Sequence, residues 1–384
     1  MTLLSGHDAR SMNLMLDEHL AYITDAVRLE RFRAALDKVV RRGDRVADLG
    51  CGTGILGLLC LRAGAGRVYF VDDSPMIEVA RRAVERAGLS EQAVFISGRS
   101  LRVELPERVD LALCDHVGYF GLDYGIVPLM QDAGRRFLKP GASSMPVRIK
   151  LQVAAVESER CHELADAWHA GPVEFRWLGE YSVNRKYPMN LRREELFGGP
   201  ADLGTIDLRE RNAEFFSWKA AMRAERDAVV HGIGGWFDCE LAEGVWMTNS
   251  PVSGSSIRRD QAFFPIGEPV RLKAGDRLNV AVMARPADDL IAWTVEFPAT
   301  GQRFSHSTWQ GSLLASEDLM RANPYRMPKP TRDGLARMTV LGYCDGTRSA
   351  REIEQAVLQE HPQLFPSAAE ISRFIALVLG RDTR

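Results

Sequence analysis

A run of glycines between an apolar strand and an apolar helix is the feature that most constrains how this chain can fold. Arg45 to Leu49 is typical of a short strand, and an apolar helix is expected to begin at Ile55. Glycine lets the backbone turn tightly and approach a ligand closely, and the N-terminus of the following helix offers unpaired N–H groups. The segment therefore predicts a ligand-binding loop after the first strand of an α/β sheet, with glycines at three alternate positions: Gly50, Gly52 and Gly54.

The acids around this loop indicate the kind of ligand. Dinucleotide-binding loops space their glycines as G-x-G-x-x-G, whereas the spacing here is G-x-G-x-G. Asp48 would repel a pyrophosphate but suits S-adenosylmethionine, which carries an ammonium and a sulfonium. The next strand ends at Asp72, whose carboxylate can accept hydrogen bonds from ribose hydroxyls, and the strand register favours it over Asp73. The pattern predicts S-adenosylmethionine as cofactor, and a purely structural glycine turn is the alternative.

Strands and helices continue to alternate up to residue 145, which predicts a parallel sheet. A helix is expected over residues 76–87, and strands are expected over 93–96 and 109–114. Ligands bind at the carboxyl ends of such strands, so residues 114–125 are expected to lie over the cofactor beside the methyl acceptor; an ordinary surface loop is the alternative. The candidate bases in this loop are Asp115 and His116, and the other candidate catalytic residues are Tyr119, Asp123 and Tyr124.

The chain resembles the protein arginine methyltransferases over about residues 15–300. The segments that carry the resemblance are VADLGCGTGILGLLCLRAGAGRVYFVD, ELPERVDLALCDHVGYF, FLKPGASSMP and VVHGIGGWFDCEL. The resemblance implies that Arg28, on an N-terminal helix, grips the methionine carboxylate of the cofactor. The expected cofactor-binding residues are therefore Arg28, Asp48, Gly50, Gly52, Gly54, Asp72 and Ser100.

The sequence departs from this family where the acceptor binds. The family clamps the substrate guanidinium with two glutamates, whose positions fall on Asp115 and on Tyr124, with Asp123 adjacent. A Thr-His-Trp motif of the family would fall near residues 257–259, where none of it is present. One shortened carboxylate is a poor clamp for a guanidinium, which stays protonated, so an amide, imidazole, hydroxyl or carboxylate acceptor is a better match. Arg258 and Arg259 are either a contact for an anionic acceptor or, as we favour, two solvated arginines.

Antiparallel strands are expected from residue 147 onward. Apolar residues alternate with others from Leu278 to Ala284 and from Ile291 to Phe297, as in half-buried strands. The resemblance implies a helical arm for head-to-tail homodimers at about residues 180–215, where a plain surface excursion fits nearly as well. The expected domains are an α/β Rossmann-like cofactor-binding domain (1–145), an antiparallel β-barrel for substrate binding and dimerisation (146–320), and a small helical or winged-helix module (331–384).

A proline-rich linker over residues 321–330 is expected to precede this last module. Ser349-x-x-Glu352 and Ser367-x-x-Glu370 are capping boxes, and each precedes an apolar helical pattern. The stretch LGYCDGTRSAREIEQAVLQEHP resembles the PqqD-like fold, a peptide-binding domain found beside enzymes that modify ribosomally made peptides. The resemblance implies binding of a leader peptide by strand addition, and a helix bundle that packs on the barrel or helps dimerise fits equally well.

Composition limits the remaining classes of protein. The 384 residues include 49 Lys plus Arg and 51 Asp plus Glu, and a net charge of −2 argues against a dedicated nucleic-acid binder. Six dispersed cysteines without a zinc-type spacing predict reduced thiols in the cytoplasm and no metal site. No signal peptide or bilayer-spanning run is evident, so no membrane partner is expected.

These observations predict an S-adenosylmethionine-dependent methyltransferase. The first expectation is methylation of a peptide or protein side chain, with nitrogen favoured by the resemblance, in the biosynthesis of a ribosomal peptide natural product. The second is a natural-product enzyme that methylates a small amine, guanidine or carboxylate. A third, less favoured, is a catalytically inactive module that keeps the cofactor-binding fold.

Overall fold

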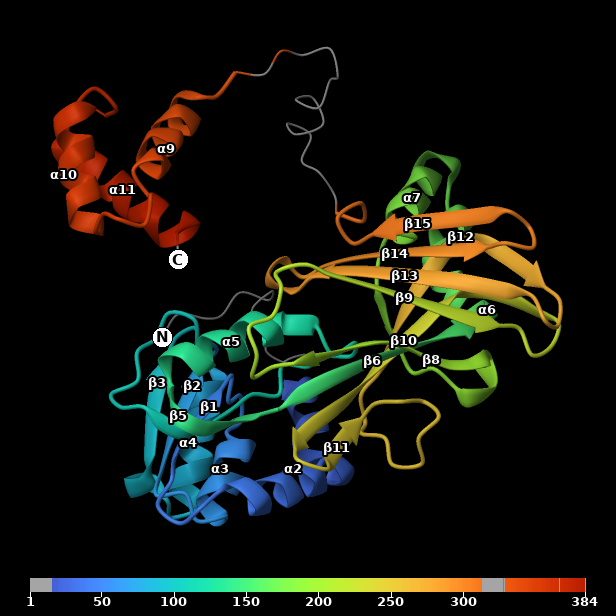
Figure 1. Ribbon diagram of the computed structural model, residues 1–384, viewed down its shortest axis with the longest axis horizontal. Coiled ribbons are helices and arrows are strands. Elements are labelled where there is room, and N and C mark those ends of the chain that lie inside the picture. The colour runs from blue at the N-terminus through green and yellow to red at the C-terminus, as the bar shows by residue number, and fades with distance from the viewer. Residues whose placement is uncertain (1–15, 313–326, 328, 366, 384) are drawn as a thin grey trace. The chain divides into compact units, whose positions relative to one another are not determined.

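The computed structural model describes residues 16–312, 327, 329–365 and 367–383, and the chain divides into two compact units after Ser312 (Figure 1). The first unit contains the α/β domain and the antiparallel strands, and the described residues of the second contain helices α9 to α11. The expected linker at residues 321–330 lies mostly outside the described residues. Of the helices in the described part of the chain, none is long and apolar enough to cross a membrane.

Five parallel strands form the first sheet in the order β3-β2-β1-β4-β5, which confirms the predicted Rossmann-like core. The strand order changes direction at β1, whose two neighbours are β2 and β4, and ligands bind at such switch points. The strands are β1 (Arg45–Leu49), β2 (Arg67–Asp72), β3 (Ala93–Ser97), β4 (Val109–Leu113) and β5 (Leu138–Met145). The helices are residues 16–24, α2 (Ala26–Val39), α3 (Ile55–Arg62), α4 (Met76–Arg86) and α5 (Ile126–Arg136).

Two antiparallel sheets follow the cis peptide bond between Met145 and Pro146. One sheet has the order β7-β12-β10-β6-β8, with β11 paired to β10, and the other has the order β15-β14-β13-β9. The predicted alternation in β13 and β14 is confirmed by their burial. Their bounds are β6 (Arg148–Val156), β7 (Tyr187–Met189), β8 (Leu196–Asp207), β9 (Phe216–Arg223), β10 (Ala228–Ala242), β11 (Val245–Thr248), β12 (Gln261–Leu272), β13 (Arg277–Arg285), β14 (Leu290–Phe297) and β15 (Gln302–Ser307).

The α/β part and the antiparallel part share one apolar core. This core runs without interruption from Leu29 on α2 through Phe120 in the loop after β4 to Phe237 on β10 and Phe297 on β14. Burial of large apolar side chains is the main favourable contribution to folding, so a shared core holds the two parts in one geometry. The loop that follows β4 is therefore held against strand β12, with the ring of Phe120 packed edge-on to that of Phe264 and the two ring centres 5.0 Å apart.

The helical excursion from the antiparallel sheets lies earlier in the chain than the sequence predicted. The regular structure in the expected arm at residues 180–215 is mainly strands β7 and β8. The helical segments instead occupy residues 159–182 and consist of α6 (Glu159–Asp166), η3 (Ala167–Ala170), η4 (Val173–Leu178) and α7 (Gly179–Ser182). The difference arises because this segment is built from short α-helical and 3₁₀ pieces of four to eight residues, which are too short for a sustained apolar period in the sequence.

The C-terminal unit has its own small core. Both predicted capping boxes are confirmed, since Ser349 and Ser367 each cap their helix and exchange hydrogen bonds with a glutamate three residues later. The described part of this unit contains no β strand, so the helical module is seen and a winged-helix sheet is not. Its helices are α9 (Arg332–Gly342), α10 (Ala350–Glu360) and α11 (Ala368–Asp382), and its buried apolar residues are Val340, Ile353, Val357, Ile371, Ile375 and Val378.

Candidate cofactor and acceptor site

The glycine loop lies at the carboxyl end of β1, against the end of β2. The N–H groups of Gly50 and Cys51 both donate to the carbonyl of Val71, at 2.8 and 3.0 Å. Gly50 and Gly52 have φ angles of 69° and 51°, which side-chain-bearing residues rarely adopt. A Cβ atom on Gly50 would lie 2.2 Å from Nε2 of His116, so this position has no room for a side chain.

The other two glycines of the loop are constrained in the same way. A Cβ atom on Gly52 would lie 2.5 Å from Cε1 of His19, on the N-terminal helix. Gly54 begins α3 with a φ of 74°, and a Cβ atom there would lie 2.8 Å from the Cβ of Ala80. The glycine loop thus has no side chains at these positions and packs closely beside the imidazoles of His116 and His19, with Gly52 and Gly54 buried and Gly50 partly exposed. A backbone without side chains lets a ligand approach closely.

Asp48 and Asp72 flank this loop, and both are buried. Asp48 accepts a hydrogen bond from the N–H of Gly57 at 2.8 Å, and burial raises the pKa of its carboxyl to about 7. Asp72 accepts from the N–H of Gly52 at 2.7 Å and from both the N–H and the hydroxyl of Ser74, at 2.8 and 2.6 Å. Ser100 lies farther along, after β3, and its carbonyl accepts from Arg136 at 2.7 Å.

Arg28 lies on the first turn of α2, where Asp25 caps the helix by accepting from the N–H of Arg28 at 3.1 Å. Its Nε donates to Oδ2 of Asp115 at 2.7 Å, and its Nη1 donates to the carbonyl of Tyr22 at 3.0 Å. Among the described residues, Nη2 has no hydrogen-bond partner, so this atom is open to a ligand carboxylate. The sequence did not suggest that Arg28 would also pair with the first acid of the acceptor loop.

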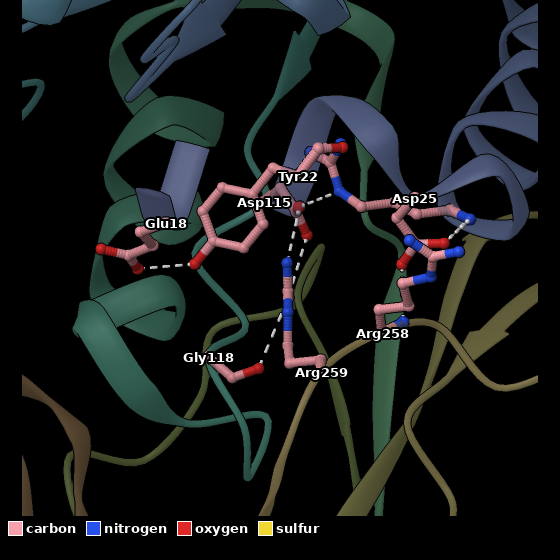
Figure 2. Close-up of polar contacts among 8 residues, drawn as sticks. Glu18, Tyr22, Asp25, Asp115, Gly118, Arg258 and Arg259 are labelled. Carbon is pink, nitrogen blue, oxygen red and sulfur yellow. Dashed lines mark hydrogen bonds and ion pairs between the residues drawn. The ribbon is translucent and has the colours of Figure 1, made fainter. Parts of the chain in front are cut away.

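Arg259 enters the site from the segment between β11 and β12, and Figure 2 shows it directed at Asp115. Its Nη2 lies 3.1 Å from Oδ2 of Asp115, and its Nη1 lies 3.4 Å from both Oδ1 of Asp115 and the carbonyl of Gly118. Its side chain is 8% exposed, whereas Arg258 is exposed and only its backbone N–H contacts Asp25, at 2.6 Å. The favoured expectation of two solvated arginines is therefore wrong for Arg259.

The Asp115 carboxylate is thus shared by two buried guanidinium groups. Burial by itself would raise the pKa of Asp115, but Arg259 and Arg28 outweigh that effect and hold the pKa below its ordinary value. The guanidinium carbons of Arg28 and Arg259 lie 5.5 and 5.1 Å from the ring centre of Tyr22 (Figure 2). Tyr22 and Asp25 were missed by the sequence reasoning, although both lie within six residues of Arg28 on the segment that was singled out.

The remaining residues of the acceptor loop have different surroundings. His116 is near the glycine loop, its ring centre lies 6.3 Å from that of Tyr124, and burial lowers the pKa of its imidazole. Tyr124 is 57% exposed and has a φ of 54°. Such a ring at the rim can contact an incoming acceptor without itself being buried.

Asp123, by contrast, holds the loop in shape. Its Oδ2 accepts from the N–H groups of Tyr119 and Phe120, at 3.0 and 2.7 Å, and its Oδ1 is paired with the buried ammonium of Lys186. The same ammonium lies 4.7 Å from the ring centre of Tyr119. Because both carboxylate oxygens are engaged, Asp123 is not available to take a proton from an acceptor.

Comparison with known proteins agrees with this geometry. Residues 46–141 match the family model described as "Methyltransferase domain". The chain is 32% identical over 243 residues to "Probable protein arginine N-methyltransferase 6.1" of Oryza sativa subsp. japonica, which covers 58% of this chain and 60% of that protein. It is 26% identical over 267 residues to "Arginine N(omega)-methyltransferase" of Streptomyces achromogenes subsp. streptozoticus, with 68% and 74% covered. The chain thus spans about 60% of the length of the rice relative.

Solved structures share the fold. The Trypanosoma brucei PRMT1 enzyme-prozyme heterotetrameric complex with AdoHcy superposes with a TM-score of 0.66 at 22% identity, over 75% of this chain and 96% of that chain. Arabidopsis thaliana protein arginine methyltransferase 10 gives a TM-score of 0.65 at 21% identity, over 76% and 98%. This chain therefore carries an S-adenosylmethionine-dependent methyltransferase domain within a fold similar to that of the protein arginine methyltransferases.

Proposed function

We propose that this chain transfers a methyl group from S-adenosylmethionine to a side chain of a peptide or protein. The observation that carries the proposal is the convergence of the bare glycine loop, Asp48, Asp72 and Arg28 at the carboxyl ends of β1 and β2. Arg28 Nη2 is the group we assign to the methionine carboxylate of the cofactor, and Asp72 the group for its ribose hydroxyls. We assign Asp48 to bind the ammonium of the cofactor.

In this assignment, the loop after β4 binds the methyl acceptor. His116 lies beside the glycine loop and is neutral near pH 7, because burial lowers the pKa of its imidazole. A neutral imidazole beside the cofactor can accept a proton from an acceptor nitrogen. Tyr119 and Tyr124 are the positioning groups in this proposal.

Methylation of a small molecule is the second candidate. It is favoured by the likeness to the Streptomyces relative, whose name describes an arginine N(omega)-methyltransferase and of which 74% is covered. The acceptor in this case is a small amine, guanidine or carboxylate. The two candidates differ in whether the C-terminal unit is needed for methyl transfer.

Recruitment of a peptide by the C-terminal unit is part of the first candidate, in line with a role in ribosomal peptide biosynthesis. The unit has a core of its own, as expected of a separate binding module. Strand addition needs an exposed strand edge, and residues 329–365 and 367–383 contain no strand. A peptide held there would therefore bind against helices α9 to α11 rather than extend a sheet.

A homodimer in a reducing compartment completes the proposal. The helical segments at residues 159–182 expose large apolar side chains, which mark a protein-contact surface: Leu164, Trp168, Val173, Phe175 and Trp177. All six cysteines are free, as expected of a cytoplasmic protein.

The test combines cofactor binding with methyl transfer. Calorimetry with S-adenosylhomocysteine should detect binding to both the full chain and a chain ending at Ser312, because every assigned cofactor contact lies before that residue. Methyl-tritiated S-adenosylmethionine is then added to lysate of the source organism with either chain. Label in a peptide or protein that disappears on truncation supports the first candidate, and label in a small metabolite that persists supports the second. Absence of cofactor binding would leave the chain as an inactive binding module.

A further inference from the structure

We propose that Arg259 binds the acceptor, and that the group it selects is a carboxylate, which leaves the site as a methyl ester. This inference rests on the methyl-transfer function proposed above and names its acceptor. It departs from the nitrogen acceptor that the names of the relatives suggest. It is based on the ion pairs made by Asp115, the first acid of the loop that is proposed to bind the acceptor.

Asp115 is already paired with two cations and is a poor partner for a third, cationic acceptor. Its Oδ2 accepts from Arg28 at 2.7 Å and from Arg259 at 3.1 Å, and its Oδ1 lies 3.4 Å from the other terminal nitrogen of Arg259. The side chains of Asp115, Arg28 and Arg259 are 10%, 4% and 8% exposed, so little water screens their charges. Two guanidinium groups offset the charge of Asp115, and the remaining positive charge is balanced by the methionine carboxylate when the cofactor binds Arg28. The cluster therefore does not attract an incoming guanidinium, and an acceptor carboxylate meets the positive sulfonium beside the free donors of Arg259.

The backbone around Arg259 is held in place, so this arginine is a fixed part of the site. Its N–H donates to the carbonyl of Ile257 at 2.9 Å, and its carbonyl accepts from the amide of Gln261 at 3.0 Å. The fully buried amide of Asn249 ties the next residue, Asp260, to the acceptor loop, by donating to the carbonyl of Asp260 at 2.7 Å and to that of Tyr119 at 2.9 Å. A solvated arginine whose side chain had only by chance rotated into the site would not need these backbone hydrogen bonds.

Arg259 also retains donors for a second anion. A guanidinium has five N–H groups, and the contacts with Asp115 and Gly118 use three of them: both on Nη1 and one on Nη2. The Nε–H and one N–H on Nη2 have no partner among the described residues. Two parallel N–H groups of this kind are the usual partners of a carboxylate.

The second acid of the loop does not restore a cation site. Asp123 is engaged by the N–H groups of Tyr119 and Phe120 and by the ammonium of Lys186. Tyr124, where the family resemblance places a second glutamate, has a neutral side chain. Burial also raises the pKa of the Tyr124 phenol, so the group stays uncharged at neutral pH.

Transfer to a carboxylate balances without a base. A lone pair of the carboxylate oxygen forms the new O–CH₃ bond, and the S–CH₃ electron pair returns to sulfur, which becomes a neutral thioether. No proton is released, and one negative and one positive charge disappear together. A guanidinium acceptor would instead have to bind as a cation beside two arginines that repel it, and it would have to pass a proton to a base, which Asp115 is poorly placed to be because both arginines hold its pKa low.

The decisive experiment is the stability of the transferred methyl group to base. The full chain is incubated with methyl-tritiated S-adenosylmethionine and lysate of the source organism, and the products are treated with mild alkali. Methyl esters release volatile tritiated methanol, whereas N-methyl groups do not. The expected result is volatile label, reduced at least about tenfold in Arg259→Leu through a higher KM for the acceptor, and partly retained in Arg259→Lys.

Arg258→Leu is the matched control, because it removes the neighbouring positive charge from an exposed side chain. It should keep the parental rate, and calorimetry with S-adenosylhomocysteine should show that all three variants bind the cofactor. Base-stable label on arginine, or equal loss in Arg258→Leu and Arg259→Leu, would overturn the carboxylate acceptor while leaving methyl transfer in place. Absence of any label with the parental chain would overturn the proposed function and the acceptor assignment with it.

Discussion

The guanidinium of Arg259 lies 3.1 Å from the carboxylate of Asp115, although 144 residues separate the two in the chain. Asp115 follows a strand of the parallel sheet, and Arg259 precedes a strand of the antiparallel sheets. The contact therefore joins the two parts of the first unit at the site where the acceptor is proposed to bind. It also replaces an open acid by a buried ion cluster in which two guanidinium groups offset one carboxylate.

This cluster should contribute strongly to stability. Asp115→Asn leaves two buried guanidinium groups without their counter-charge, and we expect it to lower the free energy of unfolding by about 3–5 kcal/mol. Denaturation in urea measures the change. Glu296→Gln, which breaks the exposed pair with Arg303, should cost less than about 1 kcal/mol. If the two substitutions cost the same, the cluster is not the buried unit described above.

The pH dependence of that contribution follows from the sign of the pKa shift. The two arginines hold the pKa of Asp115 below its unfolded value near 4, so the stabilisation is fully present above that value and is lost as the pH falls through the folded pKa. The stability difference between the parental chain and Asp115→Asn should therefore shrink only below about pH 4. A difference that shrank near pH 6 would point to another group.

Cofactor binding should depend on the acid at the end of β2. Asp72→Ala removes the acceptor of the Gly52 and Ser74 hydrogen bonds and of the proposed ribose contact, so affinity for S-adenosylhomocysteine should fall at least about tenfold. Asp73→Ala is the control, because that side chain is 54% exposed and pairs only with Arg99. Calorimetry measures both variants, and equal losses would contradict the assignment of Asp72.

Asp48 should make cofactor affinity rise with pH. Burial raises its pKa to about 7, with contributions from Asp72 and Asp115 opposed by the Gly57 N–H and by Arg28. A bound ammonium favours the ionised form, so affinity for S-adenosylhomocysteine should increase about tenfold from pH 6 to pH 8. The Asp48 contribution to the stability of the unliganded chain should have the opposite sign, being greatest at low pH and lost as the pH rises through 7. Asp48→Asn should bind weakly with no such rise, and an unchanged profile would contradict the assignment.

Self-association should depend on the apolar side chains of the segment at residues 159–182. Phe175 and Trp177 are 52% and 54% exposed in the single chain, so burying the remaining half of each in a dimer would contribute about 1 kcal/mol each. Replacing both by Ser should shift the protein toward monomer in analytical ultracentrifugation. Leu101→Ser changes a side chain that is 54% exposed in the α/β part of the first unit and should leave the association unchanged. A parental monomer would contradict the proposed dimer.

Features that depend on residues close together in the chain were predicted correctly. The glycine loop, the strands on either side of it and the capping boxes at Ser349 and Ser367 all have short spacings that determine their backbone geometry. The alternation in β13 and β14 also identified their buried faces. On helix α9, Leu335 and Met338 are spaced to share one helix face, yet both side chains are more than half exposed.

The character of the acceptor site was decided only by tertiary structure. Arg258 and Arg259 are identical and adjacent in the sequence, yet one is solvated and the other lies in an ion cluster with Asp115 and Arg28. Likewise, only the pairing with Lys186 and the loop N–H groups reveals that Asp123 holds the loop. By itself, the sequence determined the cofactor loop and the class of fold, because these follow from local backbone requirements. The charge available to an acceptor depends on which distant side chains the shared core brings together.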